Sequence, residues 1–171
     1  GSADVALRAA QQACPGPAAE RLRPLTARLA WGVDPAEVWA DLALDPEKDE
    51  AIQFACAAVS EAIGSAGLSS KDLARAALAM GTNFGALSSM DRFLRKPSDP
   101  MAGQWFRETL PHGPTDAVAK ALDIAGVRIS VSLSCASGNA AVAVALDLLR
   151  TGAAEVAIAG GYDAITDLSW S

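Results

Sequence analysis

The sequence is poor in the residues that several classes of site require. It holds one histidine and three cysteines in 171 residues. The cysteines, Cys14, Cys56 and Cys135, are odd in number and widely spaced, so they form neither a paired metal-ligand motif nor a disulfide framework. We therefore expect reduced thiols, a cytoplasmic location, and no metal or other cofactor.

Long apolar runs and an excess of positive charge are also missing. No stretch approaches the roughly 18 apolar residues that a membrane helix needs. The net charge of −6 argues against the basic face that nucleic acids require. We therefore expect neither a membrane nor a nucleic-acid partner. Apolar residues nevertheless make up 51% of the chain, which predicts a folded protein with a large core.

The N-terminal part of the chain is predicted to be helical. Alanine, leucine and arginine are frequent in it, and Pro- and Gly-containing breaks divide it into candidate helices. These candidate helices cover residues 3–13, 18–30 and 34–44. We therefore predict two parts, a helical segment over 1–47 and a second domain over 48–171.

Strands and helices are predicted to alternate in the second domain. A helix is expected after Asp45 and another over 86–95, with an apolar strand at 76–80 between them. The Pro- and Gly-rich stretch 97–113 is expected to be irregular, and a helix follows over about 114–126.

The C-terminal part predicts a strand–helix–strand unit. Residues 127–134 alternate in a pattern that is typical of a strand. A helix over 140–150 and an apolar strand over 155–159 follow it. Strands joined in this way pair in parallel. We therefore predict an α/β fold with a mainly parallel sheet and flanking helices.

Cys135 has the clearest chemical potential in this unit. It follows the predicted strand and precedes the predicted helix, where unpaired N–H groups and the helix dipole favour a thiolate. Small residues at 136–138 would let a substrate approach the sulfur. Its position alone leaves two interpretations open, a reactive nucleophile or a buried inert thiol. Cys56 lies on an apolar helix face and is expected in the core.

The sequence around Cys135 resembles the nucleophile segment of β-ketoacyl synthases, the condensing enzymes of fatty-acid and polyketide synthesis in the thiolase superfamily. The resemblance rests on SLSCASG at 132–138 followed by EVAIAGGYD at 155–163. Three further segments fit in the same order, namely QFA at 53–55, MGTNFG at 80–85 and the helix region 114–128. The resemblance covers about 45–171 and implies an incomplete N-terminal half of a thiolase-like fold.

The resemblance implies that Cys135 carries out acyl transfer. Its thiol would take an acyl group from a carrier thioester, and a carbanion from a decarboxylating malonyl unit would attack the bound acyl. The backbone N–H of Cys135 would supply half of an oxyanion hole. Gly81 and Thr82 would line the acyl pocket. Phe84 would limit acyl length, unless its ring simply packs in the core.

Partners are suggested by the resemblance and by local charge. Arg92, Arg95, Lys96 and Arg107 gather in one region that is expected to be rich in loops. They would dock an acidic acyl carrier protein, or else form an ordinary solvated surface. The family also dimerises with its nucleophile strands adjacent. The resemblance therefore implies a homodimer, or a heterodimer with a synthase half or subunit.

The sequence also departs from the family pattern. The two catalytic histidines of the family lie downstream of any residue present here, and His112 matches neither and is expected at the surface. The family's opening strand is missing, and segment 1–47 differs from the family. We therefore expect a fragment, a chain with a gap, or one subunit of a split synthase that needs a second half for condensation.

Three alternative functions remain open. A non-catalytic partner subunit, like the chain-length subunits that pair with an active synthase, would explain the missing histidines, but such subunits typically lack the cysteine. A coenzyme A thiolase places its cysteine in a different local pattern. A nucleotide-binding domain would need a Gly-x-Gly-x-x-Gly motif or a P-loop, and neither occurs.

Overall fold

The computed structural model describes residues 48–169. The chain divides into two units between Asp45 and Pro46, and the described residues lie in the second. The helices predicted at 3–13, 18–30 and 34–44 lie outside the described residues, as does Cys14.

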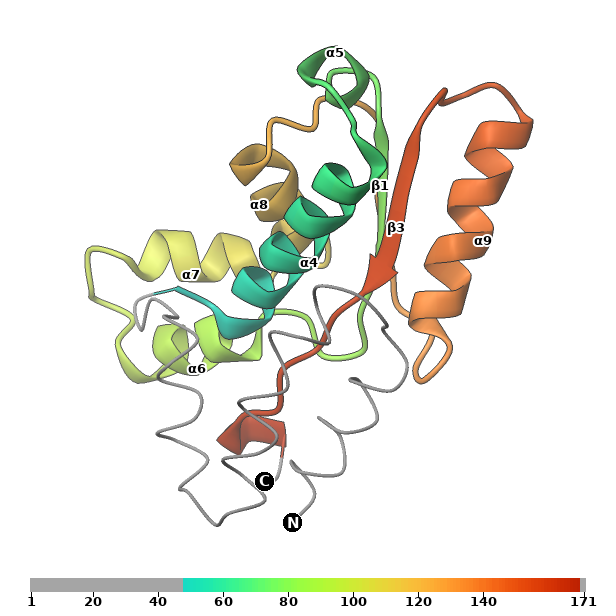
Figure 1. The fold of residues 1–171 in the computed structure, drawn as a ribbon. Coiled ribbons are helices and arrows are strands. Elements are labelled where there is room, and N and C mark those ends of the chain that lie inside the picture. The colour runs from blue at the N-terminus through green and yellow to red at the C-terminus, as the bar shows by residue number, and fades with distance from the viewer. Residues whose placement is uncertain (1–47, 170–171) are drawn as a thin grey trace, which may run out of the picture. The chain divides into compact units, whose positions relative to one another are not determined.

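A three-stranded parallel sheet lies at the centre of the described residues (Figure 1). Its strands, in the order β2-β1-β3, are β1 (Ala77–Gly81), β2 (Arg128–Val131) and β3 (Ala157–Gly161). In register, Met80 of β1 lies opposite Ser130 of β2 and Gly160 of β3. Because β1 is the central strand, all of its residues are buried, which explains its apolar run without alternation.

Helices cover both faces of this sheet. The helices of the described residues are α4 (Glu50–Ala66), α5 (Ser70–Leu73), α6 (Leu87–Arg95), α7 (Ala102–Thr109), α8 (Gly113–Ala121) and α9 (Ser137–Arg150), and a 3-10 turn, η1 (Asp167–Ser169), follows β3. Figure 1 shows α4 and α8 on one side of the strands and α9 on the other.

Alternate residues of β1 face these two helix layers. Leu78 and Met80 join a buried cluster with the apolar faces of α4 and α8. Ala79 packs on the other face against Ala141 and Ala145 of α9. Since all three side chains of this second contact are methyl groups, the helix that follows Cys135 packs closely against the sheet.

The helix predicted after Asp45 begins later than expected. Asp49 caps α4, because its carboxylate accepts a hydrogen bond from the Ile52 N–H at 3.2 Å. The helix ends as predicted near its glycines. Gly67 adopts a φ of 65°, and its N–H bonds to the Gly64 carbonyl, which closes the last turn.

The predicted α/β class, with a parallel sheet and flanking helices, is confirmed. One stretch predicted to be irregular is partly helical, and two predicted strands have other bounds. The stretch 97–113 contains α7, because Ala102 and Trp105 find a buried environment and the prolines lie outside the helix. β2 ends at Val131 because the turn before α9 begins there, and β3 extends through Gly161 because both of its glycines pair with β1.

Candidate active site

Cys135 lies in the turn between β2 and α9. The strand ends at Val131 and the helix begins at Ser137, so residues 132–136 form this Cys135 turn. The thiol is exposed to solvent and forms no disulfide. This exposure contradicts the interpretation of Cys135 as a buried thiol, while its role as a nucleophile stays a prediction.

Ser137 holds the Cys135 turn together. Its hydroxyl accepts a hydrogen bond from the Leu133 N–H at 2.8 Å and donates one to the Ser134 carbonyl at 2.7 Å. Ser134 has a φ of 47°, in the left-handed region that residues other than glycine seldom adopt. Ser137 is only 4% exposed. It therefore fixes the backbone of the turn.

Glycines let the start of α9 lie directly on the ends of two strands. A Cβ on Gly81 of β1 would lie 2.2 Å from the Ser137 carbonyl oxygen. A Cβ on Gly161 of β3 would lie 3.2 Å from the Cα of Gly138. Larger residues at these strand ends would therefore push α9, and Cys135 with it, away from the sheet.

The residues after β1, 82–85, form a second loop at the same edge, here called the Thr82 loop. Gly81 and Thr82 are buried at its base. Phe84 is 45% exposed, so the alternative that its ring packs in the core is wrong. The carboxyl edge of the sheet thus carries both the Cys135 turn and the loop that bears Phe84.

Asp163 fastens the Thr82 loop to the end of β3. Its carboxylate accepts hydrogen bonds from the Thr82 hydroxyl at 2.6 Å and from the Phe84 N–H at 2.9 Å. The Asn83 N–H donates to the same carboxylate at 3.1 Å. Sequence analysis assigned no role to this residue. The available signal was a carboxylate just after a parallel strand, at the edge where neighbouring loops converge.

Tyr162, next to Asp163, places a buried phenol at the same edge of the sheet. Its N–H donates to the Gly81 carbonyl at 2.9 Å, and its ring is buried. Burial raises the pKa of Tyr162 well above its usual value, and the nearby Thr115 hydroxyl offsets part of this effect. The phenol is therefore neutral at physiological pH.

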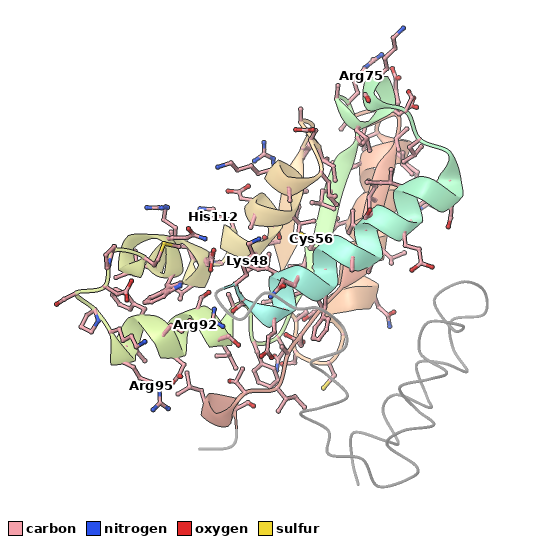
Figure 2. All side chains as sticks on the ribbon, turned by 60° about the vertical axis from the view of Figure 1, so that its left-hand side comes forward. Lys48, Cys56, Arg75, Arg92, Arg95 and His112 are labelled. Atoms are coloured by element: carbon pink, nitrogen blue, oxygen red, sulfur yellow. The ribbon has the colours of Figure 1, made fainter. Side chains whose placement is uncertain are left out.

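The two other residues considered for chemistry are structural or peripheral (Figure 2). Cys56 is half-buried and packs against the core from α4, as predicted, and burial raises the pKa of its thiol. His112 is at the surface, as predicted, with its Nε2 atom 4.0 Å from an Asp116 carboxylate oxygen.

Three of the four basic residues singled out lie on two packed helices, and the fourth directly follows one of these helices. Arg92 and Arg95 belong to α6, Lys96 follows it, and Arg107 belongs to α7. Figure 2 shows Arg92 and Arg95 on the same helix. Arg95 pairs with Asp91 at 2.7 Å. We call the four residues Arg92, Arg95, Lys96 and Arg107 together the basic patch.

Within residues 48–169, no group of three His, Cys, Asp or Glu side chains lies close enough together to hold a metal ion. None of the helices in this described part combines the length and apolar character that a membrane crossing demands.

Comparison with known proteins identifies the family. Residues 25–170 match the family model described as "Beta-ketoacyl synthase, N-terminal domain". A search of curated proteins found no match. The matched region includes β1, β2 and β3 together with the Cys135 turn and the Thr82 loop. The chain therefore belongs to the beta-ketoacyl synthase family and carries its N-terminal, thiolase-like domain.

Proposed function

We propose that this protein supplies the nucleophile of a β-ketoacyl-[acyl carrier protein] synthase of the fatty-acid or polyketide type. One observation carries the proposal: the thiol of Cys135 is exposed on a turn that is fastened at the carboxyl edge of the sheet. The other described cysteine, Cys56, is half-buried in α4 and makes a poor nucleophile.

The first chemical step is acyl transfer to Cys135. Its thiolate attacks the carbonyl carbon of a carrier-bound thioester, a new C–S bond forms, and the bond to the carrier sulfur breaks. The carrier leaves as a thiol after it takes up a proton. During this step, the backbone N–H of Cys135 donates to the developing oxyanion.

The second step forms a carbon–carbon bond. A malonyl thioester loses carbon dioxide, and the resulting carbanion attacks the acyl carbon on Cys135 and releases the cysteine thiolate. In the family, two histidines assist this step. His112 is not one of them, so a second half or subunit provides these histidines.

The acyl chain lies along the Thr82 loop. Gly81 and Thr82 line the base of the acyl pocket, and the ring of Phe84 limits the chain length that the pocket accepts. Two observations support this role for Phe84: its ring is exposed, and its loop leaves the same sheet edge as the Cys135 turn.

The partners are an acyl carrier protein and a second synthase chain. The carrier docks on the basic patch, whose charge complements an acidic protein. The second chain, identical or different, covers apolar side chains that the described residues leave exposed. On the outer face of α9, these are Val142, Leu146 and Leu149.

The test is acylation of the full chain with an acyl thioester, followed by intact-mass measurement. We expect one acyl adduct on the native protein and none on Cys135→Ala, while Cys56→Ala keeps the adduct. The midpoint of thermal unfolding shows whether each variant is folded. A folded native protein that forms no adduct, even with its second synthase chain present, would instead favour a non-catalytic partner subunit.

A further inference from the structure

We propose that Asp163 is a positioning residue that holds the Thr82 loop in place and thereby sets which acyl lengths Cys135 accepts. This inference rests on the function proposed above. Asp163 does not reach the reacting atoms in this proposal. It acts through the loop that carries Phe84.

The contacts of Asp163 are those of a loop anchor. One carboxylate oxygen accepts from the Thr82 hydroxyl, the Asn83 N–H and the Phe84 N–H, at 2.6, 3.1 and 2.9 Å. The other oxygen also accepts from the Asn83 N–H at 3.1 Å. Hydrogen bonds to an ionised acceptor are stronger than those between neutral groups. Successive backbone N–H groups that converge on one anion also form a recognised anion-binding arrangement.

The tip of the Thr82 loop has little else to hold it. Asn83 and Phe84 are exposed, Phe84 to 45%, so neither side chain is fixed by full burial. Gly85 has a φ of 65°, a conformation for which glycine is suited, and its N–H donates to the Thr82 hydroxyl oxygen at 2.8 Å. The Thr82 hydroxyl thus links Asp163 to Gly85, the residue that follows Phe84.

The base of the loop is secured without Asp163. The Thr82 N–H donates to the Val131 carbonyl of β2 at 3.0 Å, and the Gly81 carbonyl accepts from the Tyr162 N–H at 2.9 Å. Both are backbone hydrogen bonds. Loss of the Asp163 carboxylate should therefore free the tip of the loop while the sheet and the Cys135 turn stay in place.

The experiment measures how fast Cys135 reacts with N-alkyl iodoacetamides of increasing chain length. In this reaction the cysteine thiolate forms a C–S bond and iodide leaves, so no second synthase half is required. The full chain is used, and peptide masses separate modification at Cys135 from modification at the other thiols. The readout is the ratio of the rate with a long alkyl chain to the rate with a short one.

We expect Asp163→Asn to raise this ratio roughly tenfold, since the fit of even one methylene in an apolar site can change rates by that factor. Because asparagine is neutral and offers only one acceptor oxygen, the anchor weakens, and the Phe84 ring blocks the longer chains less. Asp163→Glu, which keeps the charge, should restore part of the native ratio. Asp147→Asn, at an exposed carboxylate on α9, should leave it unchanged.

A second arm asks whether the effect passes through Phe84. Phe84→Ala should itself raise the ratio, and adding Asp163→Asn to it should cause no further change. Thr82→Val, which removes the hydroxyl but keeps the shape, should act in the same direction as Asp163→Asn. This variant keeps the proposal testable if Asp163→Asn does not fold.

Two results would overturn the proposal. One is an unchanged ratio in folded Asp163→Asn despite faster amide hydrogen exchange at residues 83 and 84, which would make Asp163 a merely structural residue. The other is an effect of Asp163→Asn on the rate ratio that is as large in the Phe84→Ala variant as in the native protein. If the native protein reacts with iodoacetamides but never with acyl thioesters, the proposed synthase function fails, while the alkylation ratio still decides the role of Asp163.

Discussion

Two glycines in neighbouring strands show how one residue type can serve different purposes. Gly81 ends β1 and faces the start of α9, where a Cβ would lie 2.2 Å from the Ser137 carbonyl oxygen and 2.8 Å from the Gly138 nitrogen. Gly160 in β3 has no atom within 4 Å of its Cβ position. Of these two glycines, only Gly81 is therefore required, because the neighbouring backbone leaves no room for a Cβ.

At this scale we predict that Gly81→Ala destabilises the protein by about 3 kcal/mol or more, since rigid backbone atoms must move to relieve the clash. The free energy of unfolding in urea measures this loss. Because the shift moves the Cys135 turn, the rate of Cys135 alkylation should change as well.

Gly160→Ala is the matched control. It should leave stability unchanged or raise it by about 0.5 kcal/mol, because alanine restricts the unfolded chain more than glycine does. Equal losses of stability for the two variants would contradict the assigned contact between Gly81 and α9.

At the scale of elements, a buried carboxylate joins three helices. Asp49 caps α4 and also accepts the Ser89 N–H of α6 at 2.9 Å. The Ser89 hydroxyl in turn donates to Glu108 of α7. Burial raises the pKa of Asp49, and the negative charge of Glu108 adds to this, although the backbone N–H bonds of Ser89 and Ile52 oppose it.

This arrangement predicts how stability depends on pH. In the unfolded chain Asp49 titrates near 3.8, and in the folded protein it titrates above that value. Between the two pKa values the folded state binds more protons. The contribution of Asp49 to the free energy of unfolding is therefore fully present below pH 3.8 and is lost as the pH rises through the folded pKa. Asp49→Asn should remove this dependence of the unfolding free energy on pH. Urea unfolding across the acidic pH range measures the change.

Asp72 provides the opposite case. Hydrogen bonds from the Ser69 hydroxyl and N–H lower its pKa, so its contribution is present above pH 3.8 and is lost as the pH falls through the folded value. Asp72→Asn should therefore reduce the loss in the free energy of unfolding that occurs as the pH falls into the acidic range. The prediction for Asp49 would be contradicted if the difference in unfolding free energy between the native protein and Asp49→Asn did not change with pH.

For the molecule as a whole, charge governs the expected partner. The chain carries 14 basic and 20 acidic residues, yet four basic residues lie on α6 and α7 or directly after α6. The two helices also make a ring contact, with the Phe93 and Phe106 centroids 5.4 Å apart, so the basic patch is part of a packed unit. Such a patch attracts an acidic partner most strongly at low salt.

We predict that Arg95→Glu with Lys96→Glu weakens binding of an acidic acyl carrier protein on the order of tenfold at low salt, because repulsion replaces attraction at the rim of the interface. Surface plasmon resonance across a salt series measures this change, which should shrink as salt rises.

Lys71→Glu with Arg150→Glu is the control, since both residues are exposed on other elements and the net charge changes equally. If both double variants weaken binding to the same extent, the effect is one of net charge alone. That result would remove the basic patch as the docking site.

Features that depend on residues close together in the sequence were predicted better than features that depend on distant contacts. The order of the strands, the helix after Cys135 and the place of Cys135 between strand and helix were predicted correctly, because periodicity and turn residues act locally. α7 was missed, since burial of Ala102 and Trp105 outweighed the local Pro and Gly signals. The anchor at Asp163 was missed because its partner Thr82 lies 81 positions away.

The sequence by itself determined the α/β class and the position of a cysteine between a strand and a helix, because apolar spacing specifies which faces are buried. Only the tertiary structure decided that this thiol is exposed, that Ser137 and Gly81 hold its turn, and that Asp163 fastens the neighbouring loop. These features depend on contacts between the ends of different strands. Such contacts exist only once the parallel sheet has brought distant segments of the chain to the same edge.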